Sequence, residues 1–183
     1  IFMRYALIGC GRVSGNHIKA AKNNNLEIVA LCDIIPEKAQ ALAEKCQVQT
    51  EIYSDYKLML QEVKPELVAI ATISGNHAEI AEYCAEKGFN FIVEKPMAMS
   101  IEEADRVIAA AEKSGVIAGV SHQNRFNIAV QELRRAIDNG RFGKLSHGSV
   151  HIRWNRDENY YNQDDWRGKW ATDGGALMNQ CIH

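Results

Sequence analysis

The 183-residue chain has no long apolar segment and no large excess of either charge. None of its apolar runs approaches the roughly 18 residues that a membrane-spanning helix requires, so we expect no insertion into a membrane. Lys and Arg number 21 against 23 Asp and Glu, giving a formal net charge of −2. This balance argues against nucleic acid as the main ligand. Arg4 leads directly into an apolar run, so we expect a cytoplasmic protein without a signal peptide.

The spacing of the five cysteines argues against disulfides and against a metal site. No two cysteines form a Cys-x-x-Cys pair, and several lie beside apolar residues in expected strands or helices. Such positions are typical of buried, reduced thiols in a cytoplasmic protein. We therefore expect no metal site. The cysteines are Cys10, Cys32, Cys46, Cys84 and Cys181.

The most informative stretch is a glycine-rich turn near the start of the chain. Tyr5–Ile8 is a short apolar run of the kind that forms a buried parallel strand, and Gly9-Cys-Gly11 follows at once. Gly9 permits a tight turn, and Gly11, which has no Cβ, allows a pyrophosphate to approach the backbone. A helix expected over residues 12–25 would direct its free N–H groups at those phosphates.

An acidic residue lies where a dinucleotide-binding unit needs one. The second apolar strand ends at Asp33, 22 residues after Gly11, and an acid that binds the adenosine ribose is expected about 20 residues after the turn. Asp33 favours NAD because a carboxylate would repel a 2′-phosphate, and Ile34 and Ile35 offer no arginine to receive one. Ser14 replaces the usual third glycine but is still small.

Apolar strands and amphipathic helices alternate through the first 121 residues. Further strands are expected at residues 49–53, 67–70, 91–93 and 116–120, and helices at 36–46, 55–63, 76–88 and 100–115. Asn76 with Glu79, and Ser100 with Glu103, have the spacing of capping boxes. Six strands alternating with helices predict an α/β fold, a doubly wound parallel Rossmann sheet over residues 1–121.

The pattern changes after Ser121. Residues 127–139 are expected to form an amphipathic helix, with Val130, Leu133 and Ile137 facing inward. Residues 145–154 alternate with period two, as in a strand of an open-faced sheet. A last helix is expected to begin near Gly175. We therefore expect residues 122–183 to be the start of a truncated second α/β domain with an open sheet, which would carry substrate and oligomer contacts.

Two groups of residues could carry chemistry. Glu94-Lys95-Pro96 lies at a strand's carboxyl end, and Pro96 restricts Lys95 to an extended conformation. Its ammonium could reach a substrate hydroxyl, although a solvated lysine in a turn is the alternative. Asn179 and His183 are four residues apart and share one helical face. A histidine could accept the hydroxyl proton during hydride transfer to a nicotinamide, although an inert histidine is the alternative.

The remaining histidines and the arginine-rich segment are less specific. The histidines have no metal-like spacing, and we expect them on the surface or in loops: His77, His122, His147 and His151. Arginine binds carboxylate or phosphate through paired hydrogen bonds, and aromatic rings stack on sugars or bases. Such residues suit an anionic, ring-shaped substrate and equally a domain interface: Arg125, Arg153, Trp154, Arg156, Tyr160, Tyr161, Trp166 and Arg167.

Together these motifs resemble one family over the whole chain, the glucose–fructose oxidoreductase / inositol 2-dehydrogenase (Gfo/Idh/MocA) family. The resemblance rests on Gly9-Cys-Gly-Arg12, Asp33, Glu94-Lys-Pro96, Gln123-Asn-Arg-Phe126 and Asp173-Gly-Gly through His183. Members join a Rossmann domain to an open-sheet α/β domain whose free face often builds oligomers. The resemblance implies an NAD-dependent dehydrogenase of small sugars or polyols that forms a homo-dimer or tetramer.

Position by position, the resemblance makes Lys95 the active-site lysine and His183 the proton-accepting histidine. Asn179 stands where many members have Asp; it can orient an imidazole but cannot stabilise an imidazolium by charge. The implied cofactor-binding residues are Gly9, Gly11, Arg12, Val13, Asp33, Thr72, His77, Glu94, Lys95, Gln123, Trp166 and Arg167. The implied substrate-binding residues are Lys95, Arg125, Arg156, Tyr160, Asn179 and His183.

The segment from Arg153 to His183 looks closer to one branch of the family. That branch comprises the UDP-N-acetyl-glucosaminuronate 3-dehydrogenases of bacterial surface-polysaccharide synthesis, in which Asn is expected at position 179. They oxidise the sugar C3 hydroxyl to a ketone with NAD. Three alternatives remain open: a dehydrogenase of a free sugar or inositol, a cofactor-bound sensor without turnover, and a glycosidase with a transient redox cycle.

Overall fold

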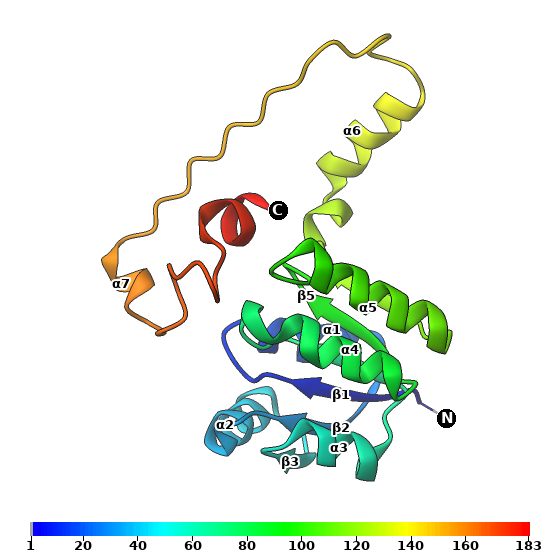
Figure 1. Ribbon diagram of the computed structural model, residues 1–183, viewed down its shortest axis with the longest axis vertical. Helices are drawn as coiled ribbons and strands as arrows, with labels where there is room; N and C mark the ends of the chain where they lie inside the picture. The colour runs from blue at the N-terminus through cyan, green and yellow to red at the C-terminus, as the bar shows by residue number, and fades with distance from the viewer. Residues whose placement is uncertain (1) are drawn as a thin grey trace.

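The computed structural model describes residues 2–183, and residues 4–121 form one parallel sheet between two layers of helices (Figure 1). The strand order is β3-β2-β1-β4-β5-β6, which confirms the predicted doubly wound α/β fold. Winding reverses between β1 and β4, where open α/β sheets bind ligands. The strands are β1 (Arg4–Ile8), β2 (Glu27–Cys32), β3 (Glu51–Tyr53), β4 (Leu67–Ile70), β5 (Asn90–Glu94) and β6 (Ala118–Ser121).

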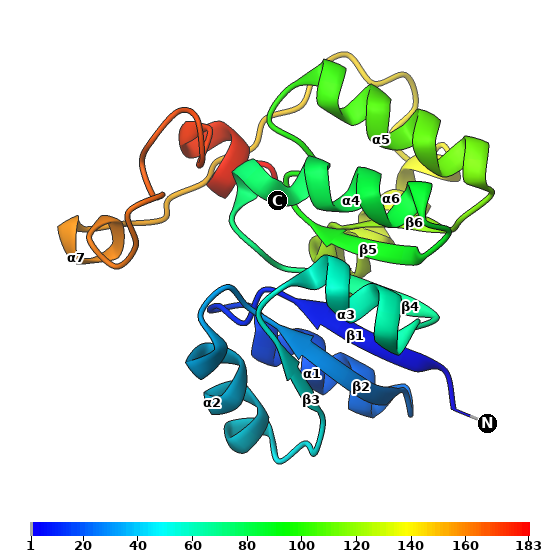
Figure 2. The same ribbon diagram turned by 60° about the horizontal axis from the view of Figure 1, so that its bottom comes forward.

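The helices cover both faces of the sheet (Figure 2). Tyr5 and Leu7 pack toward α1 and α2, whereas Ala6 and Ile8 pack toward α3, α4 and α5. Because β1 is buried on both faces, it is a continuous apolar run rather than an alternating one. The helices of this layer structure are α1 (Ser14–Asn23), α2 (Pro36–Cys46), α3 (Tyr56–Val63), the short η1 (Ser74–Asn76), α4 (His77–Glu86) and α5 (Ile101–Ser114).

Side-chain caps fix two of the helix starts. Asp55 accepts hydrogen bonds from two backbone N–H groups of α3, at 2.7 and 3.2 Å, and Ser100 accepts one from the N–H of Glu103 at 3.2 Å. The predicted cap at Asn76 and Glu79 is wrong. Asn76 has near-helical backbone angles and makes no capping bond, because the turn η1 already leads into α4.

The residues after β6 leave the sheet and return to it. The helices η2 (Gln123–Phe126) and α6 (Ile128–Asp138) project away from it, and an extended, exposed segment leads back to α7 (Glu158–Tyr161) and η3 (Leu177–Cys181) (Figure 1). The predicted helix is present as α6. No helix among residues 2–183 is long and apolar enough to cross a membrane.

Two details of the second segment were predicted wrongly. Residues 145–154 form no strand, because no strand among residues 2–183 pairs with them to satisfy their backbone groups. The apolar positions of α6 do not face inward: Val130, Leu133 and Ile137 are 41%, 51% and 37% exposed. The alternation and the helical stripe are real sequence patterns, but they predict burial only where a partner surface is present.

The side chain of His77, at the start of α4, contacts the loops after β4 and β5, beside the point where the winding reverses. Its side chain is buried, with Nδ1 2.7 Å from the carbonyl oxygen of Pro96 and Nε2 3.1 Å from that of Thr72. The expectation of a surface or loop position is therefore wrong for this histidine. Burial lowers the pKa of His77 below its usual 6.5, although the two carbonyls oppose the shift.

Gly9 brings the loop after β1 against the end of β4. Its φ is +94°, and its N–H donates to the carbonyl of Cys32 at 2.8 Å. A Cβ on Gly9 would lie 2.5 Å from the carbonyl carbon and oxygen of Ala71 and 2.6 Å from the nitrogen of Thr72. A Cβ on Gly11 would meet nothing within 4 Å, so that position is open.

We predict that Gly9→Ala destabilises the fold by about 2–4 kcal/mol, because the clash is with backbone atoms and the φ disfavours a side chain. Urea unfolding of the ligand-free protein measures this. The matched control, Gly11→Ala, should change stability by less than about 0.5 kcal/mol. Equal losses in the two variants would contradict the packing described at Gly9.

We predict a pH dependence of stability that comes from His77. The unfolded chain takes up a proton at this residue below a pH of about 6.5, whereas burial disfavours the proton in the folded chain. Stability should therefore fall as the pH drops through that value. His77→Gln, which cannot titrate, should lose less stability over the same range in urea unfolding at several pH values. Parallel curves for the two proteins would contradict a neutral, buried imidazole.

Candidate active site

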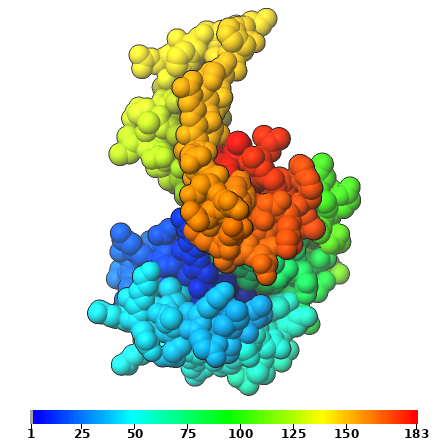
Figure 3. Space-filling model, turned by 90° about the vertical axis from the view of Figure 1, so that its left-hand side faces the viewer, coloured from blue at the N-terminus to red at the C-terminus, as the bar shows by residue number. Residues whose placement is uncertain are grey.

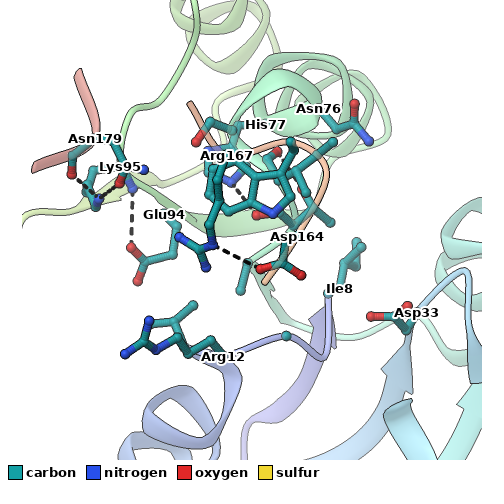
Figure 4. A pocket seen from close by; sticks show the side chains of 18 of the residues that line it. Ile8, Arg12, Asp33, Asn76, His77, Glu94, Lys95, Asp164, Arg167 and Asn179 are labelled. Atoms are coloured by element: carbon teal, nitrogen blue, oxygen red, sulfur yellow. Dashed lines mark hydrogen bonds and ion pairs between the residues drawn. The ribbon is translucent and has the colours of Figure 1, made fainter. Parts of the chain in front are cut away.

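A cavity of about 740 Å³ opens at the carboxyl ends of β1, β2, β4 and β5, beneath the C-terminal segment (Figures 3 and 4). Asp33 lies at one end of it, and Lys95 and Asn179 lie at the other (Figure 4). The predicted site residues that line it are Gly9, Gly11, Arg12, Val13, Asp33, Thr72, His77, Glu94, Lys95, Gln123, Arg156, Tyr160, Trp166, Arg167, Asn179 and His183.

Three residues of the predicted substrate-binding group do not line this cavity: Arg125, Arg153 and Tyr161. Of these, the family resemblance assigns Arg125 to the substrate. Arg125 lies in η2 and is exposed, whereas Gln123 of the same turn lines the cavity. In a 3₁₀ helix, side chains three apart are eclipsed, so a residue two positions on points elsewhere. The sequence motif Gln-Asn-Arg-Phe therefore contributes its first residue to the cavity and not its arginine.

Asp33 fixes the loops at its end of the cavity. Its carboxylate accepts hydrogen bonds from the N–H of Cys10 at 2.8 Å and the N–H of Ile35 at 2.9 Å. Two carboxylate oxygens can accept about four hydrogen bonds, so Asp33 keeps acceptor capacity for a ligand hydroxyl. The open position at Gly11 lies beside it, at the entry to α1.

A nearly buried hydrogen-bonded pair supports the other end of the cavity. Nε2 of His17, on α1, lies 2.9 Å from Oε1 of Glu94, and both side chains are nearly buried. Burial alone would raise the pKa of Glu94, but the contacts with His17 and Ser121 outweigh it and lower that pKa. His17 was not predicted as a site residue. Its place on the apolar stripe of α1, next to buried Ile18, was the available signal.

Lys95 reaches from the end of β5 to the C-terminal segment. Its Nζ donates to the backbone carbonyl of Asn179 at 2.7 Å and to Oδ1 of the same residue at 3.1 Å (Figure 4). Burial lowers the pKa of Lys95, and the nearby carboxylates of Glu94 and Asp173 oppose that shift. An ammonium has three N–H donors, so one remains for the cavity. Lys95 is therefore not a solvated lysine in a turn.

His183 lies near Lys95 but is not held by Asn179. Its Nδ1 is 3.3 Å from the amide nitrogen of Gln123. Burial, reinforced by the positive charge of Lys95, lowers the pKa of His183, which favours the neutral imidazole. Because an amide nitrogen only donates, Nδ1 accepts from Gln123 and is the ring nitrogen without a proton. The side chain of Asn179 bonds instead to Lys95 and to Asp173, so orientation of His183 by Asn179 is not what the structure shows.

Tyr160 is the centre of the arginine-rich group. Guanidinium carbons of Arg12, Arg156 and Arg167 lie 5.8, 5.0 and 4.6 Å from the centre of its ring. Its hydroxyl accepts hydrogen bonds from Arg167 and Gln180, each at 2.8 Å. These contacts join the C-terminal segment to the entry of α1, and Figure 3 shows the segment lying over the N-terminal half. The group is therefore both a cavity wall and an internal interface.

Comparison with known proteins identifies the family. Residues 3–122 match the Gfo/Idh/MocA profile, described as an oxidoreductase family with an NAD-binding Rossmann fold, and residues 130–183 match the Gfo/Idh/MocA C-terminal domain. The chain is 35% identical to D-apiose dehydrogenase of Paraburkholderia graminis over 149 residues, which are 81% of this chain and 40% of the relative. It is 34% identical to D-glucoside 3-dehydrogenase of Escherichia coli over 146 residues, 78% of this chain and 41% of the relative.

A solved structure resembles the chain over its whole length. The WlbA dehydrogenase of Bordetella pertussis, in complex with NADH and UDP-GlcNAcA, superposes with a TM-score of 0.93 and 38% identity, covering 100% of this chain and 57% of that protein. The chain spans about half the length of these relatives. It belongs to the Gfo/Idh/MocA oxidoreductase family, and residues 3–122 are its NAD-binding Rossmann domain.

Proposed function

We propose that this protein is an NAD-dependent dehydrogenase that oxidises a sugar hydroxyl to a ketone, and that the sugar is a UDP-linked N-acetyl-hexosaminuronic acid oxidised at C3. The observation that carries the proposal is that Lys95 lies at the end of the cavity opposite Asp33 (Figure 4), and that His183 lines the same cavity close enough for the charge of Lys95 to act on its imidazole. The likeness to the WlbA dehydrogenase, which was crystallised with NADH and UDP-GlcNAcA, supports the choice of substrate.

The residues at the Asp33 end fit a dinucleotide. Space is open where a Cβ of Gly11 would lie, so phosphates can approach the backbone there at the start of α1. Asp33 has free acceptor capacity for ribose hydroxyls. We assign the phosphates to Gly9, Gly11, Arg12 and Val13, and the nicotinamide half to Thr72, Glu94, Lys95, Gln123, Trp166 and Arg167. His77 contributes a wall of the cavity, since both its ring nitrogens face backbone carbonyls.

The proposed chemistry at the Lys95 end of the cavity requires a protonated lysine and a neutral histidine. NAD supplies the hydride acceptor when it is bound. His183 accepts the proton of the hydroxyl at Nδ1, where the hydroxyl takes the place of the Gln123 amide. The third N–H of Lys95 donates a hydrogen bond to the same oxygen. Such general acid–base groups typically contribute about 10²–10⁴-fold to a rate. Both residues are present and lie together, which argues against a sensor without turnover.

The second candidate is a dehydrogenase of a free sugar. It is supported by the likeness to D-apiose dehydrogenase. D-glucoside 3-dehydrogenase is likewise named for a sugar without a nucleotide. The arginines around Tyr160 favour an anionic substrate instead, because guanidinium groups bind phosphate and carboxylate strongly. The two candidates differ in whether the nucleotide accelerates the reaction. The remaining expectations, a cytoplasmic homo-dimer or tetramer and a domain boundary between residues 121 and 122, stay predictions.

We predict that Asp33→Ala weakens NAD binding by about 10–100-fold, since a charge-assisted hydrogen bond contributes about 1.5–3 kcal/mol. Titration calorimetry with NAD and with NADP measures this. NADP should lose less affinity, because the removed carboxylate also repels the 2′-phosphate. Equal losses for both cofactors would mean that Asp33 acts only by holding the loops of Cys10 and Ile35.

We predict that Lys95→Met and His183→Asn each bind NAD normally but lose about 10²–10⁴-fold in hydride transfer. Single-turnover reduction with UDP-N-acetylglucosaminuronic acid as substrate measures the transfer step. A matched control is Lys113→Met, an exposed lysine on α5, which should keep the full rate. Near-normal turnover in either site variant would remove that residue from the proposed mechanism.

A further inference from the structure

Asp173 is a buried carboxylate that the proposed chemistry does not use. It is 3% exposed, and no lysine, arginine or histidine among residues 2–183 forms an ion pair with it. Its Oδ2 accepts a hydrogen bond from the N–H of Gly168 at 2.7 Å, and its Oδ1 accepts one from the side-chain amide of Asn179. A buried charge is costly in free energy unless its partners compensate for it. The question is therefore what Asp173 contributes in return for this cost.

The local backbone brings Asp173 and Asn179 together. Gly174 and Gly175 have φ values of +71° and +73°, a region that side chains other than glycine rarely adopt. A Cβ on Gly174 would also lie 2.5 Å from the sulfur of Met178. The two glycines therefore turn the chain sharply between Asp173 and η3, and the amide of Asn179 returns to the carboxylate six residues earlier.

The amide of Asn179 lies between two groups of fixed hydrogen-bonding character. An ionised carboxylate only accepts hydrogen bonds, and a lysine ammonium only donates them. Asp173 therefore requires the NH₂ of Asn179 to face it, and this leaves Oδ1 facing Nζ of Lys95, at 3.1 Å. The two contacts independently require the same orientation of the amide. A chain of hydrogen bonds thus runs from the buried carboxylate to the ammonium.

We propose that Asp173 is a positioning residue that orients the amide of Asn179 toward Lys95 and supplies the negative charge which an asparagine at position 179 lacks. Asp173 acts through Asn179 and does not touch the substrate. The expected effect of Asp173 on catalysis rests on the proposed role of Lys95. Its expected effect on the protonation of the Lys95 ammonium does not.

The charges around Lys95 define the expected pH effect. Burial lowers the pKa of this ammonium; Glu94 and Asp173 oppose the shift, and Arg167 adds to it. The charge of Lys95 also acts on two histidines, His77 and His183. Removing the charge of Asp173 should therefore lower the pKa of Lys95 further. The protonated lysine would then be lost at a lower pH.

The test compares Asp173→Asn with the exchanged pair Asp173→Asn/Asn179→Asp in the complete protein. The single variant keeps the size of the side chain but removes the charge and leaves two amides facing one another. The exchanged pair keeps every hydrogen bond: the new Asn accepts from Gly168 and donates to the new Asp, which accepts from Lys95. The pair is therefore expected to fold with wild-type stability even where the single variant does not.

The direct readout is the pH at which Lys95 becomes reactive toward acetic anhydride, measured by mass spectrometry, which needs neither substrate nor turnover. We expect Asp173→Asn to lower that pH by about one unit and the exchanged pair to restore or raise it. The alkaline limb of kcat/KM for the sugar should move in the same direction, with NAD affinity unchanged.

Two outcomes would overturn the inference. Lys95 could keep its wild-type reactivity profile in Asp173→Asn, or the exchanged pair could behave no better than the single variant, as it would if Asp173 only stabilised the turn at Gly168. A shift in Lys95 reactivity without a shift in kcat/KM would instead support the positioning by Asp173 and contradict the proposed catalytic role of Lys95.

Discussion

The contact between Lys95 and Asn179 joins two parts of the chain that are 84 residues apart. The ammonium comes from the end of β5, and both acceptors come from η3 in the C-terminal segment. Without this contact the carboxyl ends of the strands would form an open shelf. With this contact, the C-terminal segment covers the ends of the strands and encloses the cavity, and the lysine is partly shielded from water. The proposed chemistry depends on that shielding, because a solvated lysine and histidine would have ordinary pKa values and no fixed position.

The two ends of the cavity are built by different means. Around Asp33 the sheet topology is decisive. The turn at Gly9 packs on backbone atoms of Ala71 and Thr72, just after β4, and the carboxylate of Asp33 joins the loops after β1 and β2. Around Lys95 the C-terminal segment depends on side chains, with Tyr160 among the arginines and Asp173 beneath Asn179. A local substitution can therefore disturb the second end more easily than the first.

The sequence predicted the sheet well because local signals and burial agree there. The strand at residues 67–70 was predicted with its observed bounds, and Asp33, Lys95, Asn179 and His183 were all placed at the cavity. Prediction was poorer where residues distant in sequence determine whether a segment forms a strand or buries its apolar face. The alternation at residues 145–154 looks like a strand but has no strand to pair with among the described residues, and the apolar stripe of α6 has nothing to pack against.

The partners of His17, His77 and Asn179 are set by the fold and not by neighbouring sequence, which is why these residues were missed or wrongly assigned. His17 pairs with Glu94 across 77 positions of sequence, and no spacing rule connects them. His77 looked like a loop histidine because its carbonyl partners belong to backbone, which carries no sequence signal. The role of Asn179 was judged by its distance of four residues from His183, whereas the fold directs its amide to Asp173 and Lys95.

A cavity that binds NAD together with a nucleotide-linked sugar acid should support reduction of the nicotinamide by that acid. The complete protein is given NAD and UDP-N-acetylglucosaminuronic acid, and nicotinamide reduction is followed in a single turnover without added oxidant. A 2-oxo acid is tested in a separate assay as the oxidant that regenerates tightly bound cofactor. The account predicts reduction that is lost when either the UDP group or the sugar carboxylate is removed. Equal rates with free sugars or inositols, or no reduction with any of these substrates, would contradict it.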